Sequence, residues 1–130
     1  MARTIIESYP PLSTLDKENT VEGKFVQFHW QGNEYLLFAT RDEHRFHNQM
    51  LARFFAEHDM LHHWLDDQTL EFDTARVKVT GGGRFRFERQ KKLLALWDNS
   101  QAYGRFDDEG LADRIKASGH IFGSGEITIS

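Results

Sequence analysis

Apolar and polar residues alternate in several short runs of this chain, as they do in half-buried β-strands. Between residues 24 and 30, Lys24, Val26, Phe28 and Trp30 would share one face of a strand. Gln31-Gly32-Asn33 predicts a turn, and residues 34–39 predict the returning strand of a hairpin. Further strands are expected at residues 75–80, 85–88, 93–97 and 126–129, while residues 1–20 indicate an irregular arm that could hold a first edge strand.

Two other segments carry apolar residues at helical spacing. Thr40 and Glu43 match a capping box, which predicts that a long helix begins there. The helix could be interrupted at residues 57–59 and would end at residues 66–68. Its apolar face would comprise Phe46, Met50, Phe54, Leu61, Trp64 and Leu65.

Residues 109–117 predict a second, shorter helix with Leu111 and Ile115 facing inward. At 130 residues the chain has the size of one ordinary domain, large enough to bury a single core. The two helices and about six strands therefore predict one α+β domain over residues 1–130, a mixed β-sheet flanked by two helices.

Composition and charge narrow the classes of function. The formal net charge of −4 disfavours general nucleic-acid binding, and the lack of cysteine excludes disulfides and thiolate chemistry. The start of the chain lacks the apolar segment of a signal peptide, and the longest apolar run, residues 93–97, is too short to span a bilayer. We therefore expect a soluble cytoplasmic protein without a membrane partner, as a monomer or weak dimer. Residues 76–92, with seven basic residues and one acid, indicate either solvated strands or a surface for a phosphorylated partner.

The most distinctive stretch is Thr80-Gly81-Gly82-Gly83-Arg84, which Ser100-Gln101-Ala102-Tyr103-Gly104 follows further along the chain. Consecutive glycines let backbone N–H groups approach an anion closely, because no Cβ obstructs them. Arg84 would add a fixed positive charge. These are parts from which a phosphate pocket can be built, although most glycine-rich segments are only turns.

These residues resemble the phosphohistidine phosphatase family, also called the Janus/Ocnus family. The resemblance rests on the block from Gly81 to Gly104, which includes Lys91-Lys92, on Phe46-His47 and on Lys24-Phe25-Val26. It covers roughly residues 20–130 and implies the fold of that family. The chain departs from the family pattern in a longer segment between His47 and Gly81, and in Asp98-Asn99, where the family has Gly-Tyr.

The resemblance implies a hydrolase that cleaves the P–N bond of phosphohistidine, or of phospholysine, without a metal or other cofactor. Its substrate would be a phosphorylated protein or a small phosphoramidate. His47 would be the catalytic residue, as a general base or as a nucleophile. Cationic side chains and backbone N–H groups would hold the phosphoryl oxygens. The implied phosphate-binding residues are Lys24, Arg84, Ser100, Gln101 and Ala102, and the further candidates are Arg41, Arg45 and Gly83.

Two other functions compete with this one. A non-catalytic module that binds phosphorylated proteins would have the same fold, because a fold does not imply an activity. Metal binding is the third hypothesis, since four histidines would project within a narrow arc of one continuous helix: His44, His47, His58 and His62. Two histidines spaced i, i+4 do not close a metal site, so this hypothesis is the least favoured.

Overall fold

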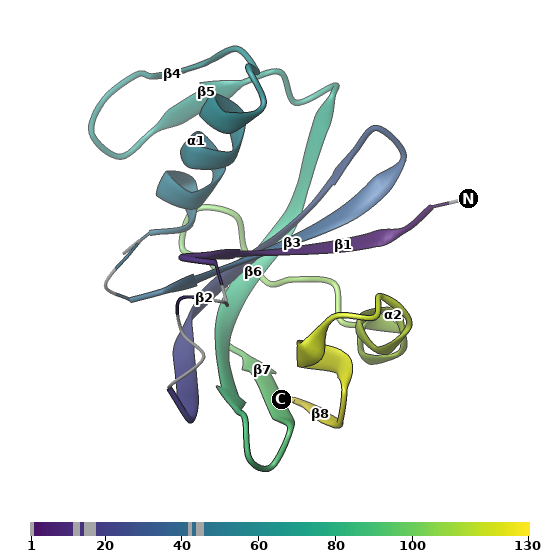
Figure 1. The fold of residues 1–130 in the computed structure, drawn as a ribbon. Helices are drawn as coiled ribbons and strands as arrows, with labels where there is room; N and C mark the ends of the chain where they lie inside the picture. The colour runs from purple at the N-terminus through teal and green to yellow at the C-terminus, as the bar shows by residue number, and fades with distance from the viewer. Residues whose placement is uncertain (1, 12–13, 15–17, 42, 44–45) are drawn as a thin grey trace.

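The structure, a computed structural model, describes residues 2–11, 14, 18–41, 43 and 46–130. The elements that these residues form are shown in Figure 1. In chain order they are β1 (Thr4–Tyr9), β2 (Thr20–Trp30), β3 (Asn33–Thr40), α1 (His47–Glu57), β4 (His62–Trp64), β5 (Leu70–Phe72), β6 (Val77–Glu88), β7 (Leu93–Trp97), α2 (Leu111–Ala117), the 3₁₀ helix η2 (Ile121–Gly123) and β8 (Glu126–Ile129).

Six strands form one mixed sheet in the order β1-β3-β2-β6-β7-β8. β1 pairs with β3 and β7 pairs with β8 in parallel, whereas the other neighbours are antiparallel. β4 and β5 form a separate two-stranded sheet. The predicted α+β architecture with a mixed sheet and two helices is confirmed, and the expected edge strand in the first 20 residues is β1.

The main sheet buries side chains on both of its faces, and Figure 1 shows α1 and α2 on opposite sides of it. Alternation along β2 directs Phe28 to the α1 side, where its ring packs 5.0 Å from that of Phe54. On the α2 side, the ring of Phe38 packs 4.9 Å from that of Phe122. Burying one such side chain contributes about 1.5–3 kcal/mol, so the two apolar cores hold both outer layers onto the sheet.

The three glycines lie inside a strand and not in a turn. β6 runs from Val77 to Glu88 and pairs with β2 along its length, with an irregularity at Gln27 and Phe28. A Cβ on Gly81 would collide with the carbonyl group of Arg105, and one on Gly83 would lie 2.5 Å from the carbonyl oxygen of Trp97. The expectation of two strands joined by a glycine turn was therefore wrong: glycine is needed here for close packing on the sheet.

The first helix begins later and ends earlier than its apolar pattern predicts. α1 starts at His47, and the side chain of Gln49 accepts a hydrogen bond from the backbone N–H of Phe46 at 3.2 Å. Beyond Glu57 the chain enters the β4–β5 hairpin, where Leu61 is 94% exposed and Leu65 is 58% exposed. The predicted apolar face was therefore wrong beyond Phe54, and Phe46 is itself half exposed.

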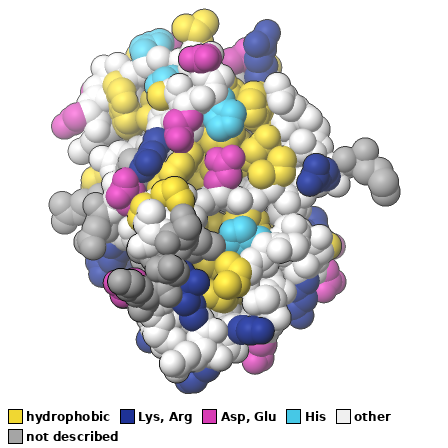
Figure 2. Space-filling model, in the orientation of Figure 1, with side chains coloured by type: hydrophobic (Ala, Val, Ile, Leu, Met, Phe, Trp, Pro, Cys, Tyr) yellow, Lys and Arg dark blue, Asp and Glu magenta, His cyan; other side chains and the backbone are white. Residues whose placement is uncertain are grey.

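The second helix was predicted correctly, because Leu111 and Ile115 are buried in α2. In the described part of the chain, no helix is both long enough and apolar enough to cross a membrane. The basic stretch at residues 76–92 is not a surface of one sign, since Arg86 lies 3.4 Å from Glu88. Figure 2 shows cationic and anionic side chains interspersed over the visible face. The stretch itself is interpreted as solvated strands, because four of its basic residues form ion pairs at 3.1–3.6 Å: Arg76, Arg84, Arg86 and Lys91.

Candidate functional site

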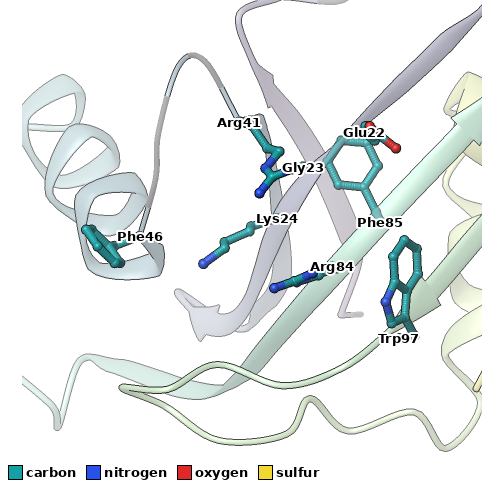
Figure 3. Close-up of a pocket in the computed structure, with 8 residues that line it drawn as sticks. All are labelled: Glu22, Gly23, Lys24, Arg41, Phe46, Arg84, Phe85 and Trp97. Carbon is teal, nitrogen blue, oxygen red and sulfur yellow. The ribbon is translucent and has the colours of Figure 1, made fainter.

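Three cationic side chains project into one cavity of about 380 Å³ beside β2 and β6. Lys24 and Arg84 are direct partners in the antiparallel β2–β6 pair, so their side chains leave the same face of the sheet. Figure 3 shows the charged ends of Lys24, Arg84 and Arg41 directed into the space that Phe46 faces. Like charges directly opposite each other destabilise a sheet. Their arrangement therefore indicates a site for an anion.

A second cavity, of about 670 Å³, adjoins the first, because Lys24 and Phe46 line both. Its walls come from the beginning of α1, from the β4–β5 turn and from residues 100–102. The other residues that line it are His47, Asn48, Gln49, Asp67, Gln68, Ser100, Gln101 and Ala102. The structure therefore brings His47 and the 100–102 segment together around Lys24, whereas Arg84 lies in the neighbouring cavity.

His47 is the first residue of α1 and is only 5% exposed. Its Nε2 lies 3.0 Å from the carbonyl oxygen of Gly83. A carbonyl oxygen only accepts hydrogen bonds, so the neutral imidazole donates from Nε2 and its Nδ1 is an unprotonated acceptor. No residue that the structure describes hydrogen-bonds to Nδ1. His47 thus presents one basic nitrogen in a fixed tautomer.

Gly82 makes room for this imidazole. A Cβ at position 82 would lie 2.7 Å from Cδ2 and 2.9 Å from Nε2 of His47, closer than real Cβ contacts. The N–H of Gly82 donates to the carbonyl oxygen of Gly104 at 3.1 Å, and Gly83 supplies the carbonyl that holds His47. The glycines therefore seat the histidine, and the expectation that this segment cradles an anion with its N–H groups was wrong.

Burial and charge together lower the pKa of His47 below its ordinary value. Desolvation is the largest cause, and the positive charge of Lys24 acts in the same direction. The nearby backbone of Gly83 and of Phe25 and the negative charge of Asp98 act in the opposite direction but do not outweigh them. His47 is consequently neutral at pH 7, with Nδ1 able to accept a proton.

The segment after β7 closes into a tight turn that presents two N–H groups. Ser100 donates its backbone N–H to Gly104 at 2.9 Å and accepts the N–H of Tyr103 on its hydroxyl oxygen at 3.1 Å. The Ser100 amide is therefore engaged in the turn and cannot bind an anion, whereas the Ser100 hydroxyl still has a proton to donate and Ser100 lines the second cavity. Within the described residues, the N–H groups of Gln101 and Ala102 have no acceptor, so these two remain candidates for that role.

Arg84 is held by a carboxylate to which the sequence analysis assigned no function. Its Nε lies 3.1 Å from Oδ2 of Asp98, while Oδ1 of Asp98 accepts the backbone N–H of Asn99 at 2.9 Å. Asp98 has a φ of 71°, in the left-handed region that aspartate tolerates better than most residues. This ion pair offsets part of the positive charge in the first cavity, so an entering anion must compete with Asp98.

This leaves the additional arginine candidates and the histidines of the metal hypothesis. Arg41 lines the first cavity, whereas Arg45 and His44 lie outside the described residues. The continuous helix that the metal hypothesis required does not exist, because α1 ends at Glu57 and His62 belongs to β4. Among the described residues no three potential metal ligands come together.

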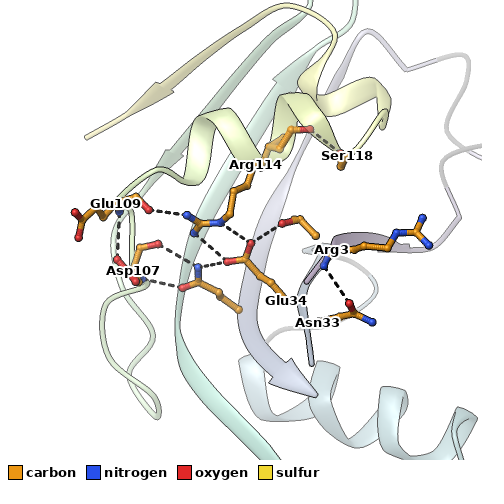
Figure 4. Close-up of polar contacts among 10 residues, drawn as sticks. Arg3, Asn33, Glu34, Asp107, Glu109, Arg114 and Ser118 are labelled. Atoms are coloured by element: carbon orange, nitrogen blue, oxygen red, sulfur yellow. Dashed lines mark hydrogen bonds and ion pairs between the residues drawn. The ribbon is translucent and has the colours of Figure 1, made fainter. Parts of the chain in front are cut away.

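A buried network on the α2 side holds the chain that follows the 100–104 turn. Gln27 accepts the N–H of Asp107 at 2.8 Å and donates to its carbonyl oxygen at 3.1 Å. Glu34 in turn accepts hydrogen bonds from Thr4, Gln27 and Arg114 (Figure 4). The network links β1, β2, β3 and α2 and so restricts the position of residues 105–109.

The sequence profile of the Janus/Ocnus family matches residues 19–122, about four-fifths of the chain. This chain belongs to the Janus/Ocnus family. The match includes every residue that lines the two cavities of this Janus/Ocnus protein, from Glu22 to Ala102. Comparison with curated proteins finds no significant match. Membership of the family, which the short motifs indicated, is confirmed, and the phosphatase activity stays a prediction.

Proposed function

We propose that this protein hydrolyses the P–N bond of phosphohistidine, or of a related phosphoramidate, with His47 as the general base. One observation carries the proposal. A buried, neutral imidazole with an unpaired Nδ1 shares a cavity with a lysine and with the N–H groups of Gln101 and Ala102. A base and donors that suit phosphoryl oxygens thus border one space.

The proposed reaction begins with a water molecule between His47 and the phosphorus atom. As the water oxygen bonds to phosphorus, Nδ1 of His47 accepts the proton that the water loses. The P–N bond breaks, and its electron pair leaves with the nitrogen. Lys24 and the N–H groups of Gln101 and Ala102 would balance the charge of the three phosphoryl oxygens. The first turn of α1 adds the positive potential of a helix amino terminus.

Arg84 and Arg41 would assist from the neighbouring cavity. Their guanidinium groups lie on the other side of Lys24, which borders both spaces. An arginine can bind two oxygens at once with its planar group, whereas a lysine acts as a point charge. Removing either arginine should therefore weaken substrate binding and leave the ionisation of His47 little changed.

Direct attack of Nδ1 on phosphorus is the alternative route, and it would form a phosphorylated His47 that water then hydrolyses. Both routes need a neutral imidazole, so the lowered pKa of His47 suits both. Acid hydrolyses a phosphorylated histidine. The reaction should therefore be stopped with alkali, and the protein should be analysed by mass spectrometry. The general-base route predicts no added phosphoryl group on the peptide that contains residue 47.

The test of the proposed function is phosphate release from a peptide that carries chemically phosphorylated histidine. We expect turnover by the wild type and a loss of about 10²–10⁴-fold in His47→Asn, while the affinity for inorganic phosphate changes little. Lys24→Ala should lower both rate and affinity. The matched control is His29→Asn, because His29 is an exposed histidine of β2 that lines neither cavity.

Two results would contradict this proposal in different ways. If His47→Asn retained the wild-type rate, the activity would exist but the assignment of His47 would be wrong. If the wild type bound the phosphorylated peptide without releasing phosphate, the protein would be the non-catalytic phosphoprotein-binding module that is the second candidate.

A further inference from the structure

The turn between β4 and β5 forms a wall of the second cavity for which the proposed chemistry has no role. Asp67 and Gln68 of this turn line the cavity together with His47 and Lys24. The neighbouring Asp66 stabilises the turn itself, because its carboxylate accepts hydrogen bonds from Gln68 at 2.8 Å and Thr69 at 3.3 Å. Asp67 makes no hydrogen bond or ion pair with the described residues. Its carboxylate is therefore available to a ligand.

Asn48 adds a second acceptor to the same wall. It is the second residue of α1, is 8% exposed and lines the cavity. Its Nδ2 donates to the carbonyl oxygen of Gln68 at 2.8 Å, which ties the β4–β5 turn to the start of the helix. Oδ1 of Asn48 has no donor among the described residues. Asn48 lines the cavity and its Oδ1 is not a buried atom, so this oxygen can accept a hydrogen bond from a ligand there.

The cavity thus contains two chemically different sets of groups. Lys24 and the N–H groups of Gln101 and Ala102 suit an anion, whereas Asp67 and Oδ1 of Asn48 suit a cation that carries N–H donors. A carboxylate beside a phosphoryl group alone would repel it. The pairing of both sets is explained if the ligand is itself a zwitterion, with a negative phosphoryl group and a positive nitrogen base.

We propose that Asp67 and Asn48 form the subsite for the leaving nitrogen base, and that this subsite selects phosphoramidates with a cationic leaving group. The inference rests on the proposed function and deepens it, because it assigns recognition of the protonated leaving nitrogen to Asp67 and Asn48. Asp67 attracts the positive charge, and Oδ1 of Asn48 accepts an N–H of the leaving group.

The bonding changes of the proposed reaction account for this preference. The nitrogen base of the bound substrate already carries an extra proton before the P–N bond breaks. When the bonding pair moves to nitrogen, the base leaves as neutral imidazole or amine, and no proton transfer from the protein is needed. Asp67 acts by charge alone, stabilising the protonated form that is ready to leave. A phosphate ester has no such cation, so Asp67 would not assist it.

The test compares kcat/KM for two substrates, a phospholysine peptide and p-nitrophenyl phosphate, in the wild type and in Asp67→Asn. We expect Asp67→Asn to lower kcat/KM about fivefold to tenfold for phospholysine, the effect of one charge pair at a partly exposed site. The value for p-nitrophenyl phosphate should stay the same or rise. Asp67→Lys should lower the ratio of the two kcat/KM values, phospholysine peptide over p-nitrophenyl phosphate, further than Asp67→Asn does. The matched control is Glu71→Gln, which removes one negative charge from the same hairpin outside the cavity.

The result that would overturn this inference is an equal change for both substrates in Asp67→Asn, with the wild type active. Failure of the proposed function would look different, because the wild type would then hydrolyse neither compound. In that case the equilibrium affinities for the phospholysine peptide and for phenyl phosphate replace the rates. Asp67→Asn is still expected to lower the affinity for the phospholysine peptide relative to that for phenyl phosphate. An unchanged ratio of these two affinities would refute the subsite.

Discussion

The two faces of the sheet bury similar polar groups with opposite degrees of pairing. On the α2 side, Glu34 is 4% exposed and accepts hydrogen bonds from Thr4, Gln27 and Arg114. On the α1 side, His47 is about as buried, yet only its Nε2 is hydrogen-bonded within the described part of the chain. A fully paired buried group stabilises a fold, whereas Nδ1 of His47, which is not a buried atom, can bond to a ligand in the second cavity. We infer that the first arrangement maintains the structure and the second binds a ligand.

Charged partners differ between the two faces in the same way. On the α2 side, Arg114 lies 2.9 Å from the carboxylate of Glu34, a pair of opposite charges. On the α1 side, Lys24 and Arg84 are cross-strand partners of like charge, and the carboxylate of Asp98, 3.1 Å from Arg84, offsets part of that charge. Substitutions on the α2 side should therefore mainly change the free energy of unfolding, and those on the α1 side should mainly change activity or anion affinity.

The largest effect should come from Gly82→Ala. The new Cβ would lie 2.7 Å from the imidazole of His47, so the ring must move out of its place. Because a displacement of about 1 Å can cost about 10²-fold in rate, we expect at least that loss of phosphate release per folded molecule. Gly123→Ala is the control, since its Cβ would lie 2.5 Å from the carbonyl oxygen of Ile115 on the α2 side. Equal turnover in the two variants would contradict the role of Gly82.

Glu34→Gln should lower the free energy of unfolding by about 2 kcal/mol, because it removes the charge from the hydrogen bonds to Arg114, whose side chain is 39% exposed and stays solvated. Urea denaturation monitored by circular dichroism measures this change. The ionisation of His47 should not change, since Glu34 lies on the opposite face. A loss below about 1 kcal/mol would show that the paired network is not a main source of stability.

The same carboxylate gives a pH dependence of stability. Burial alone would raise the pKa of Glu34, but hydrogen bonds from Arg114, Thr4 and Gln27 outweigh burial and lower the pKa below 4.5. A carboxylate whose pKa is lower in the folded than in the unfolded state stabilises the fold when the pH is above its unfolded-state pKa. This contribution is lost as the pH falls through the folded-state pKa. We expect wild-type stability to decline below about pH 4.5 and the decline to be smaller in Glu34→Gln.

Asp98→Asn should have a smaller effect than these substitutions, and the effect should be on the affinity for inorganic phosphate. Without the carboxylate, Arg84 no longer has an internal competitor for an anion, so affinity for inorganic phosphate should rise about fivefold. The free energy of unfolding should change by less than about 1 kcal/mol, because the ion pair is partly exposed. Isothermal titration calorimetry measures the affinity, with Glu88→Gln as the control outside both cavities. Weaker phosphate binding in Asp98→Asn would refute the competition.

The smallest effect is expected on the hairpin that the apolar pattern misassigned. Leu61→Ser should change the free energy of unfolding by less than about 0.5 kcal/mol, because the side chain is almost fully exposed. Met50→Ala, in the buried face of α1, should cost about 2–5 kcal/mol. Comparable losses in the two variants would mean that Leu61 is buried in solution.

The sequence predicts those parts of the site that depend on local alternation. Lys24 shares a strand face with Val26 and Phe28, and the structure confirms that this is the face that α1 covers. The pattern failed where two periodicities fit the same few residues. Leu61 and Leu65 suit either an extended helix or a short hairpin, and the structure has the hairpin.

Other features depend on contacts between distant segments. Three consecutive glycines predict a turn locally, but they lie in a strand because His47, Phe106 and Arg105 pack against it. The ion pair joins Asp98, directly after β7, to Arg84, which lies inside β6, and no periodicity of the sequence relates these two positions. Asn48 and Asp67 carry no sequence signal of their own, since only the fold brings the β4–β5 turn beside the first turn of α1.

The proposed reaction depends on His47 being a neutral imidazole with its proton on Nε2 and an unprotonated Nδ1. Nuclear magnetic resonance of protein with ¹⁵N-labelled histidine reports both the tautomer and the pKa of this residue. We expect the Nε2–H tautomer at pH 7 and a His47 pKa below the ordinary 6.5. A proton on Nδ1, or a pKa at or above 6.5, would contradict it.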